Sequence, residues 1–263
     1  MKNRIIKKIT LVSISLVLLS NVSFAKENVS SDASKLMDIA GKQRMLSQRI
    51  AKDYIYVGNK IATSKADKQL KASLSEFLKI HNELATLITD SEIKNLLDFV
   101  ALSSNELKET ANKDFTLDNA HLILDLTESM LEGNQYIVDS LKDVHKLKES
   151  NVLEKAAKQR MLSQRIAKYY IAYQSGIKDA NTVNSMKDTV KQFSENLNML
   201  LTNKNNSPEI KKKLQEIEKL WKIVHKFYNN IEKGGLPLIV FNTTDNITKK
   251  MDEVTKLYVL KDK

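Results

Sequence analysis

Apolar side chains recur at three- and four-residue intervals along most of the chain, which is the spacing of one face of an α-helix. In the first half this spacing predicts four helices, with apolar stripes over residues 39–61, 70–87, 93–107 and 122–141. The pattern breaks near residues 63–66, 89–92 and 112–118, where Ser91 or Thr116 is expected to cap the following helix.

The second half repeats this organisation. Its breaks fall near residues 175–181, 203–208 and 233–237, and Pro208 and Pro237 stand near helix starts, where proline is tolerated. The 263 residues include only 6 Gly and 2 Pro, too few turn residues for a β-sandwich, a propeller or a doubly wound α/β fold. Four helices with short connections predict an all-α fold, with one antiparallel four-helix bundle in each half.

An internal repeat explains why the two halves look alike. The segment Lys42–Lys52 reads KQRMLSQRIAK, and Lys158–Lys168 reads the same eleven letters at an offset of 116. Weaker matches continue beyond it, and the offset slips further until Met130 aligns with Met251. A shared segment of this kind indicates two diverged copies of a unit of about 115 residues. We therefore expect one domain over residues 26–148 and a second over residues 149–263.

The connection between the copies has two interpretations. Apart from Gly133, no clear breaker interrupts the chain from Asp118 to Ser175, so the last helix of copy one is expected to run into the first helix of copy two. Such a rod of about 58 residues would be roughly 87 Å long and would hold the repeated segments apart. Each segment would then need a second molecule, which predicts a homodimer. A bend near Glu149–Val152 would instead let the copies fold back on each other.

The first 25 residues have the pattern of a secretory signal peptide. Basic residues at positions 2–8 precede an apolar run at residues 9–19, and Ser23 and Ala25 are the small residues of a cleavage site after Ala25. The apolar run is about half of the roughly 20 residues that a membrane span needs, and an uncleaved anchor is the alternative. We expect the mature chain to be exported to the periplasm.

Charge and composition restrict the chemistry. The formal charge is +10, and +6 once the signal is removed, which favours small anions over cations. Basic residues are interspersed with acidic ones, so nucleic-acid binding is not expected. The chain has no Cys and 4 scattered His, and it shows no catalytic triad, metal-ligand spacing or phosphate loop. Neither enzymatic activity nor a metal or cofactor is predicted.

The repeated segment places an arginine in an unusual position. On a helix, Arg44 falls in a stripe of small residues formed by Ala40, Ser47 and Ala51. Small residues allow another helix to approach closely, and an arginine in such a seam needs a carboxylate or a bound anion. It can also reach solvent. The second copy has the same stripe, made of Ala156, Arg160, Ser163 and Ala167.

Other polar residues of the segment have less distinctive positions. Gln43 and Gln159 fall on the core side, where a buried amide could hold an arginine, contact a ligand or make a hydrogen bond within the core. Arg49 and Arg165 lie on another face, where we expect them to reach solvent.

Residues 38–50, DIAGKQRMLSQRI, resemble the signature of the PilJ-type domain, the N-terminal sensor module of type IV pili methyl-accepting chemotaxis transducers. They are also similar to the sensor domain of NarX-type nitrate/nitrite histidine kinases. The resemblance implies a four-helix bundle that binds nitrate or nitrite between two first helices. The implied anion site comprises Gly41 and Arg44 with Ala157 and Arg160, supported by Gln43, Ser47, Gln159 and Ser163.

The sequence departs from this family in that it shows no transmembrane exit, no HAMP-like linker and no kinase or methyl-accepting tail. We therefore expect a free-standing periplasmic sensor that binds a small anion and acts through a membrane-bound chemoreceptor or sensor kinase. The arginine pair could be Arg44 and Arg160 of one chain, or equivalent arginines of two chains. A second interpretation is a structural or interaction protein whose bundles no longer bind a ligand. The replacement of the motif glycine by Ala157 in copy two favours this alternative.

Overall fold

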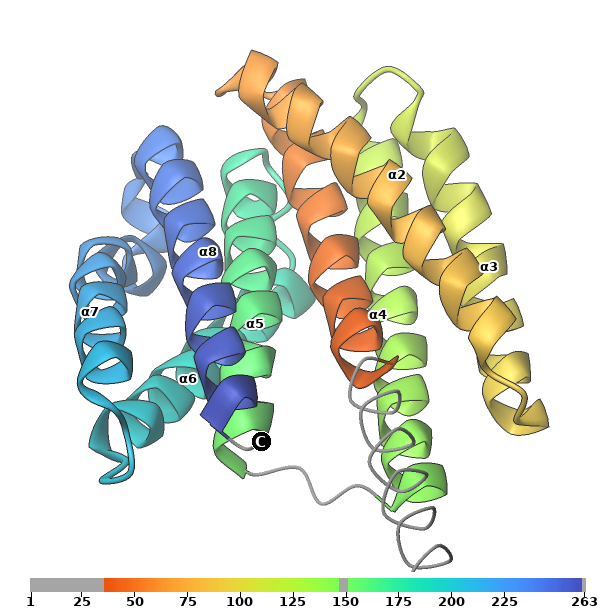
Figure 1. The fold of residues 1–263 in the computed structure, drawn as a ribbon. Coiled ribbons are helices and arrows are strands. Elements are labelled where there is room, and N and C mark those ends of the chain that lie inside the picture. Colours follow the sequence, from red (N-terminus) through yellow and green to blue (C-terminus); the bar gives the residue numbers. More distant parts are fainter. Residues whose placement is uncertain (1–35, 147–150, 262–263) are drawn as a thin grey trace, which may run out of the picture.

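The computed structural model describes residues 36–146 and 151–261, and it confirms the all-α fold. The first helix covers residues 36–58 and is unlabelled in Figure 1. The other helices are α2 (Thr63–Leu87), α3 (Ser91–Ala111), α4 (Leu117–His145), α5 (Asn151–Gln174), α6 (Ala180–Thr202), α7 (Pro208–Asn229), the 3-10 turn η1 (Ile231–Lys233) and α8 (Pro237–Lys261). No β-strand occurs in the described residues, and the predicted signal peptide lies outside them.

Side chains at the predicted breaks start the helices. Thr116 accepts a hydrogen bond from the Asn119 N–H and caps α4, as predicted. At α3 the cap is Asp90 instead of Ser91, because the Asp90 carboxylate accepts from two free N–H groups of the first turn. Pro208 and Pro237 are the first residues of α7 and α8.

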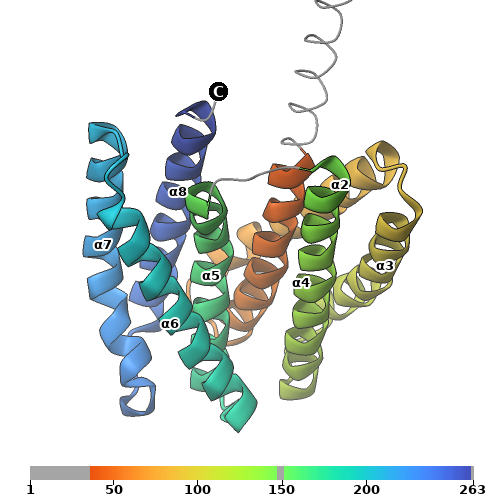
Figure 2. The ribbon, with the colours of Figure 1, turned by 90° about the horizontal axis from the view of Figure 1, so that it is seen from below.

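The first helix and α5 lie side by side at the centre of the molecule. In both views the first helix stands between α4 and α5 (Figures 1 and 2). Asp38 accepts a hydrogen bond from Arg160 at one end, and Asn59 Nδ2 donates to Ser175 Oγ over 2.6 Å at the other. The two helices therefore run in the same direction. Asn59 and Ser175 are separated by the repeat offset of 116, so equivalent positions face each other.

The predicted rod is wrong. Helix α4 ends at His145, and Lys146 has a left-handed backbone with φ 51° and ψ 37°. Lys142 Nζ lies 3.7 Å from Glu154 Oε2, whereas twelve residues of continuous helix would separate their backbones by about 18 Å. The chain therefore reverses direction between α4 and α5, which agrees with the alternative expectation of a bend. Residues 147–150, which connect the two helices, lie outside the described part. A homodimer was expected only because the rod would have kept the repeated segments apart, and the reversal removes that reason.

Two ion pairs connect the halves in a crossed arrangement. Lys52 on the first helix binds Asp245 on α8 at 2.7 Å, and Lys168 on α5 binds Glu128 on α4 at 2.5 Å. Both lysine side chains are fully buried. Burial would raise the pKa of Glu128, but Lys168 and Arg165 outweigh it and lower the pKa to about 2. The Glu128 carboxylate is therefore charged in the folded protein and joins the two halves.

We predict that Glu128→Gln destabilises the protein by about 3 kcal/mol at pH 7, because it leaves two partly or fully buried cations without their carboxylate. A folded-state pKa below the unfolded value gives stability that is present above about pH 4.5 and lost as the pH falls towards 2. The variant should therefore differ least from the parent in acid. Urea unfolding at pH 7 and pH 3 measures this. The exposed Glu132 on the same helix provides the control, Glu132→Gln; equal losses from both variants would contradict the prediction.

Candidate functional site

Two buried arginines converge on one glycine between the first helix and α5. Arg44 and Arg160 are 7% and 4% exposed. A Cβ atom placed on Gly41 would lie 3.5 Å from Arg44 Nη2 and 3.9 Å from Arg160 Nη2. Both guanidinium groups therefore lie beside Gly41, at ordinary van der Waals distance from the position of a Cβ atom. The structure brings the two predicted arginines together within one chain.

The seam of small residues that positions these arginines is present as predicted. Ala40, Ala51, Ala156 and Ala167 are all fully buried. Ser47 and Ser163 occupy equivalent places, and each hydroxyl donates over 2.9 Å to the carbonyl oxygen of the preceding arginine, Arg44 or Arg160. Both serine hydroxyls therefore donate within their own helix.

Arg160 is held by two carboxylates. Its Nη1 donates to Asp252 Oδ1 over 2.7 Å, and its Nη2 donates to Asp38 Oδ1 over 3.1 Å. Burial would raise the pKa of Asp252, but hydrogen bonds from Lys256 and Arg160 outweigh it and lower the pKa. Asp252 comes from α8, whereas Asp38 comes from the first helix and crosses the seam. Pairing with a carboxylate was one of the three expectations for this arginine, beside a bound anion and solvent.

Arg44 has a different environment. Its Nη1 donates to the amide oxygen of Gln135 on α4, and the Gln135 amide in turn donates to both carboxylate oxygens of Asp139 at 2.9 and 3.0 Å. Lys158 is close enough that burial, Lys155 and Arg44 together lower its pKa. Lys158 is therefore a further cation beside Arg44.

The predicted supporting glutamines point into the cores. Gln159 Nε2 donates to the Phe193 carbonyl over 3.0 Å, and neither Gln43 side-chain atom has a hydrogen-bond partner. Ala157, which replaces the motif glycine, accepts a 3.5 Å hydrogen bond from Arg160 Nε through its carbonyl. Of the predicted set, Gly41, Arg44 and Arg160 therefore form the cluster, and Ala157 borders it through its backbone.

Two buried glutamines of the repeated segments were not predicted to make specific contacts, and one arginine was predicted to lie in the wrong environment. Gln48 donates to the Thr127 carbonyl over 2.9 Å, and its equivalent Gln164 donates to the Thr248 hydroxyl over 2.7 Å. The exact repeat was the signal that could have identified them. The prediction that Arg165 reaches solvent is wrong, because its guanidinium forms an ion pair with Glu128 across the interface between the halves.

Asp53 is a buried acid beside the crossed ion pairs. Both its oxygens lack hydrogen-bond partners, although Oδ1 lies 3.2 Å from Lys52 Nζ. Burial raises the pKa of Asp53 to about 7, against the opposing effect of Lys52. Asp53 therefore exchanges its proton near neutral pH.

The architecture and this cluster together define a class: an all-helical bundle protein with a buried arginine pair between two parallel helices. A family profile described as "Type IV pili methyl-accepting chemotaxis transducer N-term" (PilJ) matches residues 28–95 and 145–243. The matched residues make up more than half of the chain, and the chain belongs to this family. It is a sensory helical domain related to chemotaxis transducers.

Comparison with curated proteins and with solved structures found no significant match. Within residues 36–146 and 151–261, every helix is too short or too polar to span a membrane.

We predict that Asp53→Asn flattens the dependence of stability on pH. The folded-state pKa of about 7 is above the ordinary 3.8, so the contribution of the Asp53 proton is complete below about pH 4 and is lost as the pH rises through 7. The loss is about 1.4 kcal/mol for each pH unit over which only the folded chain keeps the proton. Urea unfolding at pH 5 and pH 8 measures it. Parallel profiles for the parent and the variant would contradict the assignment.

Proposed function

We propose that the protein is an exported periplasmic sensor that binds nitrate or nitrite between Arg44 and Arg160. In this proposal the two halves, residues 26–148 and 149–263, are tandem PilJ-type domains, and their pseudo-two-fold seam forms the site within one chain. The protein has no catalytic activity and no cofactor. It reports anion binding to a membrane-bound chemoreceptor or sensor kinase.

The convergence of Arg44 Nη2 and Arg160 Nη2 on Gly41 carries this proposal. Two guanidinium groups that face the same space repel each other, and a planar monoanion between them accepts hydrogen bonds from both forks. The nearby Lys158, whose pKa is lowered by burial and neighbouring cations, adds to the positive potential. The site therefore favours a small anion that fits over a glycine.

Asp38 gives the site a means of responding to the anion. The Asp38 side chain is 56% exposed and accepts a hydrogen bond from Arg160 Nη2. The less exposed Asp252 accepts one from Arg160 Nη1. An incoming anion replaces Asp38 at Nη2 and leaves Asp252 in place. Because Asp38 lies in the first turn of the described part of the first helix, this exchange releases one end of that helix from α5.

A second candidate function rests on the same ion pairs. The Asp38 and Asp252 carboxylates already neutralise Arg160, so the arginines could serve only to join the halves of a structural or interaction protein. Nitrate would then give no binding heat, and Arg44→Ala would lower stability alone.

We predict that Arg44→Ala and Arg160→Ala abolish nitrate binding to the mature protein, because each removes one of the two forks. Isothermal titration calorimetry with sodium nitrate in 150 mM NaCl, which screens general surface attraction, measures it. The matched control is Arg49→Ala, which removes the same charge from the same helix at a position away from Gly41. Equal losses from Arg44→Ala and Arg49→Ala would indicate general attraction instead of a defined site.

We predict that Asp38→Asn tightens nitrate binding about tenfold, which corresponds to about 1.4 kcal/mol. The substitution removes the charge that competes for Arg160 Nη2. Titration of Asp38→Asn beside Asp67→Asn, a change on the surface of α2, isolates the effect. An unchanged or weaker affinity in Asp38→Asn would refute the exchange.

A further inference from the structure

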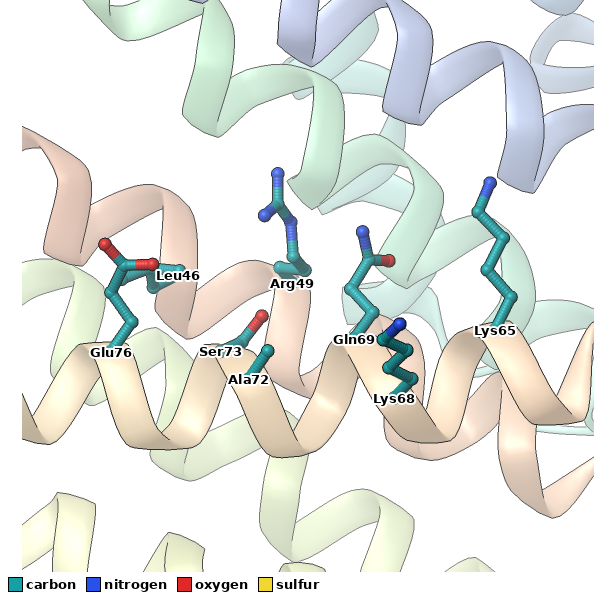
Figure 3. A pocket seen from close by; sticks show the side chains of 8 residues that line it. All are labelled: Leu46, Arg49, Lys65, Lys68, Gln69, Ala72, Ser73 and Glu76. Carbon is teal, nitrogen blue, oxygen red and sulfur yellow. The ribbon is translucent and has the colours of Figure 1, made fainter.

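A second cationic pocket lies between the first helix and α2. Its volume is about 320 Å³, within the range of small-molecule sites. Figure 3 shows the side chains that surround it: Leu46 and Arg49 from the first helix, and Lys65, Lys68, Gln69, Ala72, Ser73 and Glu76 from α2. It shares no lining residue with the Arg44–Arg160 cluster.

Arg49 in this pocket has the same sequence context as Arg165, because both belong to the repeated segment. Arg165 is satisfied: its Nε and Nη2 both donate to the Glu128 carboxylate, and its Nη1 lies 3.3 Å from Thr189 Oγ1. Arg49 Nε is buried and has no hydrogen-bond partner. No carboxylate accepts a hydrogen bond from Arg49 Nε, in contrast to Arg165, although the Arg49 charge acts to lower the pKa of the nearby Asp53 and Asp245.

The alignment of α4 with α8 shows why the two arginines differ. Gln48 binds Thr127 and Gln164 binds Thr248, so these threonines occupy equivalent places at an offset of 121. The next residue in each helix is Glu128 in α4 and Lys249 in α8. In α8, Lys249 thus occupies the position that corresponds to Glu128, the acid that pairs with Arg165. Asp245, one turn earlier on α8, is engaged by Lys52 at 2.7 Å.

The remaining lining is suited to an organic anion. Arg49 on the first helix and Lys68 on α2 provide two separate cationic positions, and Lys65 Nζ already donates to Asn242 Oδ1 over 2.9 Å. The acid of the lining, Glu76, forms an ion pair with Lys42. Leu46 and Ala72 add apolar surface, and Gln69 and Ser73 add hydrogen-bonding groups. In Figure 3 the Arg49, Gln69 and Lys65 side chains extend to the same side of α2.

We propose that this pocket binds a small dicarboxylate. One of its carboxylates accepts hydrogen bonds from Arg49, as the Glu128 carboxylate does from Arg165. The second carboxylate faces Lys68, and the short carbon chain lies against Leu46 and Ala72. The site is separate from the proposed nitrate site and takes a different class of ligand.

The test is calorimetric titration of the mature protein with sodium succinate in 150 mM NaCl. We expect binding by the parent chain and at least a tenfold loss of affinity in Arg49→Gln. Lys249→Glu restores the carboxylate at the position equivalent to Glu128, so it should also abolish succinate binding while raising the melting temperature. The matched control is Arg44→Ala, which should lose nitrate and keep succinate.

The outcomes are separable from those of the nitrate proposal. Loss of succinate binding in folded Arg49→Gln and Lys249→Glu supports the second site, whether or not the parent chain binds nitrate. Lack of succinate binding by the parent at millimolar concentration overturns it. Parent-like succinate affinity in both folded variants overturns it as well.

Discussion

The accumulation of positive charge at a close helix contact is the constraint on which the rest of the structure depends. Each copy of the repeated segment carries four cationic side chains and no acid, and the structure packs the two copies side by side. The packing is possible because alanines and serines form the seam. Every acid that compensates these charges must therefore come from outside the repeated segments.

The compensating acids hold the two halves together. Lys52 takes its acid from α8, Lys168 takes its acid from α4, and Arg160 takes one from each side of the seam. Removing any of these acids would leave a buried cation, which costs more than the ion pair itself contributes. Of these ion pairs, all but the one between Arg160 and Asp252 join a helix of one half to a helix of the other, in addition to the apolar contacts between them.

The sequence predicted the helices and the seam because both depend on local periodicity. The stripe of Ala40, Arg44, Ser47 and Ala51 is buried as its spacing implied. The reversal after α4 could not be predicted in this way, because Lys146 adopts a left-handed backbone that normally favours glycine or asparagine. A local cost of about 1–2 kcal/mol is outweighed by burial of the seam, which brings together residues more than one hundred positions apart.

The partners of the motif arginines were equally hidden from the sequence. Arg165 and Arg49 have identical neighbours over the repeated segment, and nothing in that segment distinguishes them. Their difference arises on α4 and α8, where the sequences differ: α4 has Glu128, and the corresponding residue of α8 is Lys249. The repeat therefore identifies the candidate arginines, but it does not show which of them pair with an acid in the folded protein.

Exact conservation of a cationic segment between two diverged halves has a physical consequence for ligand binding. Where the surrounding helices kept an acid, as at Arg165, the cation is neutralised within the protein and has little free energy to gain from a ligand. At Arg49 no carboxylate accepts from the buried Nε, so the proposed dicarboxylate would add a charge-assisted hydrogen bond there. In the nitrate site that we propose, the anion would replace the exposed Asp38 at Arg160 and would gain only the difference between two similar interactions. Such a small difference suits a sensor, because it allows the anion to be released when its concentration falls.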